Sequence, residues 1–156
     1  MTARPLPTCW VTMLCPDVNI LLYAFRRDST DHSRYAKWLQ LTMTGHEPVG
    51  VSELVLSGVV RLATNHRVYR QPSSTAEVLD FCRAVRSAPA AVPLRPGGKH
   101  WEIFSRLCQA VSATANDVPD AYHAALAVEN GATWITNDRG YARFPDLQWR
   151  SPVDQN

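Results

Sequence analysis

The amino-acid sequence predicts an α/β fold in which a mainly parallel central sheet is flanked by helices. Three observations indicate this class. Short apolar runs typical of buried strands alternate with longer segments of helical periodicity, the connections between them are short, and no repeat or low-complexity tract interrupts the order. Alternating strands and helices favour parallel pairing of the strands. With 156 residues, the chain has the length of one such domain.

We expect two strands and three helices in the first half of the chain. Apolar residues recur at helical spacing after the polar turn RRDSTDHS, and Ser52 is placed to cap the helix that follows the second strand. The expected elements are strand 11–16, helix 18–25, helix 32–45, strand 47–51 and helix 52–66.

The second half continues the alternation. Ser74 and Glu77 have the spacing of a capping box at the start of one helix, and Gly131 ends a later, alanine-rich helix. The sequence NDVP is expected to form a turn before that alanine-rich helix. The expected elements are helix 73–88, strand 90–94, helix 97–114, turn 116–119, helix 120–131, strand 132–136 and strand 147–150.

The composition is typical of a globular protein without a membrane span. Hydrophobic residues make up 46% of the chain and charged residues 19%, and no apolar run reaches the roughly 18 residues that cross a bilayer. The four cysteines lie far apart without a CxxC pair. This spacing argues against a zinc site or a disulfide scaffold and fits reduced thiols, so we expect a cytoplasmic protein. Residues 1–12 lack the apolar core of a signal peptide.

The basic residues are nearly all arginines. The chain has 16 lysines and arginines against 14 acidic residues, a net charge of +2, and its only lysines are Lys37 and Lys99. The planar guanidinium group suits bidentate contact with phosphate, so the charge leans towards an anionic partner. A GC-rich genome, which favours arginine codons, would produce the same bias.

Four acidic residues stand where strands end or helices begin. Asp17 follows the first strand, Glu53 the second, and Asp138 the strand 132–136, while Asp120 opens the alanine-rich helix. Each acid alone could be an ordinary helix cap or turn residue. In a parallel sheet, however, such junctions meet at one edge. Four carboxylates so close together would repel one another, and a hard divalent cation such as Mg²⁺ or Mn²⁺ would relieve the repulsion.

Four segments in this order resemble those of PIN-domain ribonucleases, and among these the VapC-type toxins of bacterial VapBC toxin–antitoxin pairs. The segments are DVNILLYA, SELVLSGVVRLATN, PDAYHAALAVENGATWIT and TNDRGYARFPDLQW. The resemblance implies a single PIN-like domain with a three-layer fold at residues 13–152. Residues 1–12 would then be a tail or an alternative start, and residues 153–156 a C-terminal tail.

The resemblance also implies the activity. Asp17, Glu53, Asp120 and Asp138 carry over as the catalytic cluster, which holds Mg²⁺ or Mn²⁺. The expected function is a Mg²⁺-dependent endoribonuclease toxin that hydrolyses structured RNA, tRNA or rRNA, by metal-activated water. The implied partners are a VapB-like antitoxin and a second copy of the chain in a homodimer.

Several residues near these acids have open roles. Asn19 and Thr136 are expected beside Asp17 and Asp138, respectively, as supporting groups. Asp117 is either an additional metal ligand or a polar loop residue. His123 either orients a ligand or fills space on the alanine-rich helix, and its neighbours favour the second interpretation.

Arginines close in sequence to the acidic junctions are candidate contacts for RNA phosphates, Arg139 first because it follows Asp138. They are Arg26, Arg27, Arg61, Arg139 and Arg143. Each could equally be a solvated surface arginine or the partner of a nearby acid.

Two other functions compete with the nuclease. A PIN-like domain could bind RNA or a protein partner without catalysis, although the presence of all four acids argues against a degenerate site. A phospho-receiver domain also groups acids at strand ends, but it needs a lysine after a late strand. Neither Lys37 nor Lys99 has that position.

Overall fold

The computed structural model describes residues 12–153 of the chain. The expected tails, 1–12 and 153–156, fall outside this part except for Thr12 and Val153, and so does Val11 of the first expected strand. Within the described part the strands are β1 (Leu14–Pro16), β2 (Val49–Ser52), β3 (Ala91–Leu94), β4 (Thr133–Ile135) and β5 (Gln148–Arg150). The helices are α1 (Val18–Phe25), α2 (His32–Met43), α3 (Glu53–Ala63), α4 (Thr75–Ser87), α5 (His100–Val111), α6 (Asp117–Glu129) and the 3₁₀-helix η1 (Arg139–Arg143).

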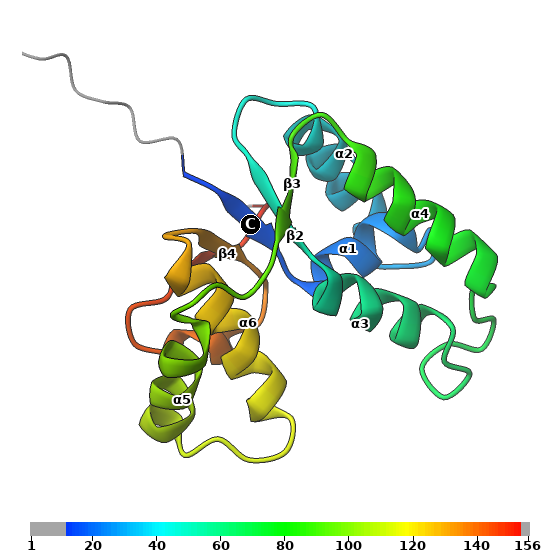
Figure 1. The fold of residues 1–156 in the computed structure, drawn as a ribbon. Helices are drawn as coiled ribbons and strands as arrows, with labels where there is room; N and C mark the ends of the chain where they lie inside the picture. Colours follow the sequence, from blue (N-terminus) through cyan, green and yellow to red (C-terminus); the bar gives the residue numbers. More distant parts are fainter. Residues whose placement is uncertain (1–11, 154–156) are drawn as a thin grey trace, which may run out of the picture.

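The described strands form one sheet in the order β3-β2-β1-β4-β5, and every neighbouring pair is parallel. Helices α1 to α4 lie on one side of this sheet, and α5 and α6 lie on the other (Figure 1). The prediction of a three-layer α/β fold with a parallel sheet is therefore confirmed.

The order of the strands creates a switch point between β1 and β4. From β1 the chain adds β2 and β3 on one side, and it then returns to place β4 on the other side of β1. Ligand sites of open parallel sheets lie beyond the carboxyl ends of the strands at such a point. Pro16 pairs with Ile135, so the two strands end level, and the Asp17 amide donates to the Ile135 carbonyl at 2.8 Å.

Small side chains let α6 pack closely against the sheet and α5. A helix with alanine on its inner side brings its backbone near its neighbours, and the apolar area removed from water stabilises the fold by about 25 cal/mol per Å². The larger groups of this region come from β4, where Trp134 and Ile135 are fully buried. The alanines of α6 with no exposed surface are Ala121, Ala124, Ala125 and Ala127.

One predicted element is wrong, and one capping motif is confirmed. The expected turn at 116–119 is the start of α6, which begins at Asp117 and holds Pro119 in its first turn. Proline is tolerated there because the first amides of a helix have no partner within it. Ser74 and Glu77 form the expected capping box, with reciprocal hydrogen bonds of 3.2 Å. In the part of the chain that the structure describes, no helix is long and apolar enough to cross a membrane.

Candidate active site

A buried threonine joins two of the predicted acids at the switch point. Asp17 caps α1, and its Oδ1 accepts a hydrogen bond from the Val18 amide at 2.6 Å. Its Oδ2 accepts a hydrogen bond from the Thr136 hydroxyl at 2.7 Å. The same hydroxyl oxygen accepts from the Asp138 amide at 3.0 Å. Thr136 has no exposed surface, so it fixes Asp17 relative to the start of the Asp138 loop.

Asp138 caps the 3₁₀-helix that follows β4. Its Oδ1 accepts from the Gly140 amide at 2.8 Å, which closes a tight turn around the carboxylate. A Cβ atom on residue 140 would lie only 2.9 Å from this oxygen. Glycine at position 140 therefore leaves room for the carboxylate, and the rest of η1 is directed back towards α6.

Two residues of η1 contact the acids at the start of α6. The Tyr141 hydroxyl donates to Asp120 Oδ1 at 3.1 Å. The Arg143 guanidinium donates to Asp117 Oδ1 at 3.2 Å and to Asp120 Oδ2 at 3.3 Å. Asp117 also accepts from the Thr114 amide at 3.3 Å. Asp117 is thus an ion-pair partner of Arg143 within the acidic site, and its position as the first residue of α6 brings it there.

The carboxylates influence one another's ionisation. Burial raises the pKa of Asp17 to about 6, the hydrogen bonds from Thr136 and Val18 oppose the rise, and the charges of Asp120 and Asp138 add to it. Burial likewise raises the pKa of Asp120, against the effects of Tyr141 and Arg143. Burial and the neighbouring acids raise the pKa of the Tyr141 hydroxyl, which stays a donor. Asp17, Asp120 and Asp138 therefore form one electrostatic group.

Glu53, the fourth predicted acid, is not brought into this group. Its carboxylate is 68% exposed and lies 3.8 Å from the guanidinium groups of Arg86 and Arg95. Glu53 begins α3 directly after β2, which neighbours β1 on the side opposite to β4. Glu53 does lie at the end of a parallel strand, as predicted. The carboxyl edge of the sheet, however, extends beyond the group of aspartates.

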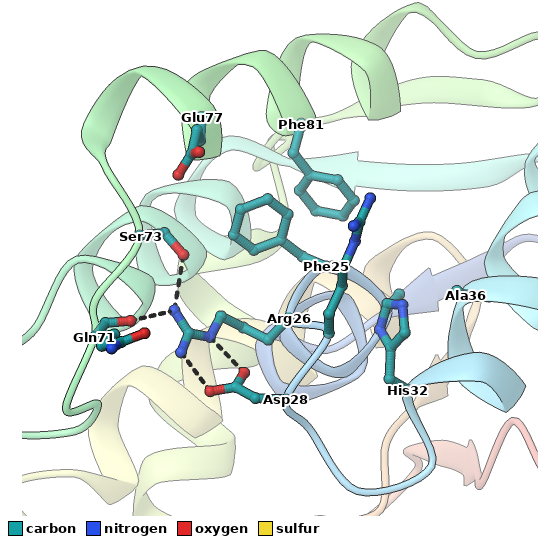
Figure 2. A pocket seen from close by; sticks show the side chains of 11 residues that line it. Phe25, Arg26, Asp28, His32, Ala36, Gln71, Ser73, Glu77 and Phe81 are labelled. Atoms are coloured by element: carbon teal, nitrogen blue, oxygen red, sulfur yellow. Dashed lines mark hydrogen bonds and ion pairs between the residues drawn. The ribbon is translucent and has the colours of Figure 1, made fainter.

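Arg26 lies in a different region, and its guanidinium is fully engaged (Figure 2). It donates to both carboxylate oxygens of Asp28, at 2.9 and 2.6 Å, and to the Gln71 carbonyl and the Ser73 hydroxyl, both at 2.9 Å. It also stacks over the Tyr69 ring at 3.9 Å. With 8% of its surface exposed, Arg26 ties the end of α1 to the α3–α4 connection.

The other candidate residues are either exposed to solvent or buried in the core. Asn19 is exposed in the first turn of α1, and Arg139 is exposed at the start of η1. His123 is buried, lies parallel to the Trp134 ring at 5.3 Å, and has a pKa lowered by burial to about 4, so it is a neutral packing residue. His100 is also buried, and its Nε2 lies 3.1 Å from the Tyr122 carbonyl oxygen.

The donor chemistry of the aspartate group fits a hard divalent cation. Its donor atoms are carboxylate oxygens, which hard divalent cations prefer, and burial, with a smaller contribution from Asp120 and Asp138, raises the pKa of Asp17. Over residues 12–153, no three Asp, Glu, His or Cys side chains converge on one point as a complete ion site. The Arg143 guanidinium is the cation that contacts Asp120 in this arrangement.

Tyr141 is a site residue that the sequence did not single out, whereas Arg143 was a candidate phosphate contact and is found paired with Asp117 and Asp120. The available signal for Tyr141 is its position three residues after Asp138. Periodicity could not orient it, because a 3₁₀-helix after a tight turn has no long repeat.

The PIN-domain family matches the chain over residues 14–147, which include the whole sheet except the last three-residue strand. The chain is 46% identical over 142 residues to VapC ribonuclease Mb2897 of Mycobacterium bovis, which covers 91% of the chain and 97% of that protein. It is 34% identical over 140 residues to ribonuclease VapC31 of Mycobacterium tuberculosis, covering 90% and 99%. The chain therefore belongs to the VapC ribonuclease family of PIN-domain proteins.

Solved structures share the fold at low sequence identity. One is the VapBC2 complex of Rickettsia felis, bound to a DNA fragment from its promoter. A chain of this complex matches with a TM-score of 0.65 at 16% identity, and the match covers 90% of the present chain and 98% of that chain. VapBC-1 of nontypeable Haemophilus influenzae gives a TM-score of 0.64 at 14% identity, with the same coverage.

Proposed function

We propose that this protein is a metal-dependent endoribonuclease, the toxin of a toxin–antitoxin pair. The observation that carries the proposal is the aspartate group at the switch point, in which Thr136 joins Asp17 to the Asp138 loop and Asp120 adds a third carboxylate. The chain's relatives are named ribonucleases, which supports RNA as the substrate. We infer structured RNA, tRNA or rRNA, as the target class.

Asp17, Asp120 and Asp138 would hold Mg²⁺ or Mn²⁺. When bound, such an ion lowers the pKa of a coordinated water and neutralises charge on the phosphate. The chain's own residues prepare the carboxylates: Thr136 keeps Asp17 in a fixed orientation, and Tyr141 does the same for Asp120.

Arg143 pairs with Asp120 and Asp117, which places its guanidinium at the aspartates, where it would be a contact for RNA phosphate. Arg139, next to Asp138 and exposed, is the other cation placed for such a contact.

The partners follow from the same family. Solved neighbours are VapBC complexes, which supports a VapB-like antitoxin as the partner of this chain. A homodimer and a cytoplasmic location stay predictions.

Cleavage of total bacterial RNA by the purified chain tests the proposal. We expect new 5′-phosphate ends in Mg²⁺ or Mn²⁺ and none in EDTA. Asp17→Asn and Asp120→Asn should each abolish them, whereas Asp80→Asn, a matched change at a site 72% exposed on α4, should not. Equal cleavage by all three variants would refute the assignment of the site.

A second candidate function is RNA or partner binding without catalysis. It is favoured by the incomplete convergence of the acids in the described residues and by the Arg143–Asp120 pair. RNA binding by the wild-type chain without cleavage in either metal would support it.

A further inference from the structure

A concave surface with two arginines adjoins the aspartate group. It lies at the carboxyl ends of β4 and β5 and has a volume of about 630 Å³. This volume is within the range of small-molecule binding sites. The side chains that line it include Thr136, Asn137, Arg139, Trp149, Arg150 and Ser151. We refer to it as the β4–β5 cavity.

The β4–β5 cavity shares a wall with the acidic site. Thr136 lines the cavity, and its hydroxyl donates to Asp17 at 2.7 Å. Arg139, on another wall, directly follows Asp138. An RNA strand with one phosphate at the aspartates would therefore have a neighbouring nucleotide at this cavity.

The charge of the cavity is opposite to that of the acidic site. Within residues 12–153, no acid lines the cavity, and neither Arg139 nor Arg150 has a side-chain hydrogen bond or ion pair. By contrast, Arg143 and Arg106 are each paired with an aspartate. Two exposed guanidinium groups beside a cluster of carboxylates offset the repulsion that the cluster exerts on a polyanion.

The remaining walls are aromatic and rigid. Trp149 packs on the core, is partly exposed, and is one of the residues that line the cavity. Asn137 donates to the Tyr35 hydroxyl and accepts from the Ser151 hydroxyl at 2.6 Å. These bonds fix the wall that connects Asn137 to Ser151, so the cavity is preformed.

We propose that the β4–β5 cavity binds an RNA nucleotide next to the cleaved phosphodiester bond, with its base against Trp149 and its phosphates on Arg139 and Arg150. This inference rests on the proposed ribonuclease function. Base stacking on an aromatic ring and guanidinium contacts to phosphate are the two interactions by which proteins hold unpaired nucleotides. The cavity offers both within one site.

An acidic peptide is the other occupant that the arginines would attract. It would use Arg139 and Arg150 but would gain little from the Trp149 ring. The tryptophan therefore separates the two occupants, and we favour the nucleotide because the aromatic wall adjoins the arginines.

The test compares two pairs of variants. Arg139→Gln/Arg150→Gln removes both cavity arginines, and Arg67→Gln/Arg70→Gln removes two exposed arginines of the α3–α4 connection, with the same change in net charge. Trp149→Leu removes the aromatic wall, and Trp101→Leu removes a 74% exposed tryptophan on α5. Thermal melting verifies that each variant is folded.

Binding is measured in EDTA by fluorescence anisotropy with a fluorescein-labelled random RNA of about 12 nucleotides. We expect Arg139→Gln/Arg150→Gln to weaken binding roughly tenfold at about 0.1 M salt and to reduce the salt slope by about 1.4, the value for two phosphate contacts on a single strand. Trp149→Leu should also weaken it, on the order of tenfold. Both control variants should bind as the wild type does.

Two outcomes would overturn the inference. Cavity variants that bind RNA like their controls would exclude the nucleotide. The second outcome uses a fluorescein-labelled oligoglutamate peptide. If the Arg139→Gln/Arg150→Gln variant no longer bound this peptide but still bound RNA, the cavity would be a site for an acidic peptide. Cleavage of total bacterial RNA by the wild type in Mg²⁺ is measured in parallel, so failure of the ribonuclease proposal is seen separately.

Discussion

Replacing Asp17 by asparagine should stabilise the metal-free protein at neutral pH while it abolishes RNA cleavage. Asp17 is 6% exposed, and burial together with the charges of Asp120 and Asp138 raises its pKa from 3.8 to about 6. Asparagine has nearly the same shape, and its single oxygen can still accept the hydrogen bond from the Val18 amide, although its NH₂ group cannot accept the one from the Thr136 hydroxyl. It removes the charge and therefore the cost of burying it.

The magnitude follows from the pKa. One pKa unit corresponds to about 1.4 kcal/mol, so a rise from 3.8 to about 6 means that ionising Asp17 costs the folded state about 3 kcal/mol. A folded carboxyl with a raised pKa binds its proton more tightly than the unfolded chain does. Its contribution to stability is complete below pH 3.8 and is lost as the pH rises through about 6. The asparagine variant has no such loss.

Urea unfolding in EDTA measures this difference. Between about pH 4 and about pH 7.5, the free energy of unfolding of the Asp17→Asn variant relative to that of the wild type should rise by about 3 kcal/mol. Asp80→Asn, on the exposed side of α4, should show no such pH dependence. A variant that gains nothing at pH 7.5, or gains equally at both pH values, would refute the reasoning.

Three further substitutions have defined outcomes. Thr136→Val removes the hydroxyl that orients Asp17, and cleavage assays should show a loss of about 10- to 100-fold. Glu53→Gln should retain much more cleavage than Asp17→Asn, because Glu53 pairs with surface arginines; an equal loss would show that it joins the site when metal binds. Arg26→Met should lower the free energy of unfolding by about 2 kcal/mol and leave RNA binding intact, since its guanidinium donates to the Gln71 carbonyl and the Ser73 hydroxyl within the fold.

The positions of acids at strand ends, which meet at one edge of a parallel sheet, predicted much of the aspartate group from the sequence alone. Asp17 and Asp138 were placed correctly at the switch edge because strand ends are visible as the limits of apolar runs. Thr136 was identified by its position two residues before Asp138. Glu53 obeys the same rule but follows β2, and only the strand order shows that β2 lies outside the switch point.

Side-chain pairing could not be predicted in the same way. The contact of Arg143 with Asp120 depends on the path of η1, which the Asp138–Gly140 turn sets. The engagement of Arg26 depends on Gln71, 45 residues away in the chain. Neither contact leaves a periodic signal in the sequence.

Calorimetric titration with Mn²⁺ tests the central claim most directly, that the aspartate group is a metal site. We predict binding by the wild type and by Asp80→Asn, and none by Asp17→Asn. Because the pKa of Asp17 is about 6, binding near pH 6 should release a fraction of a proton, and binding near pH 8 should release none. An absence of binding at millimolar Mn²⁺, or equal binding by Asp17→Asn, would contradict the account.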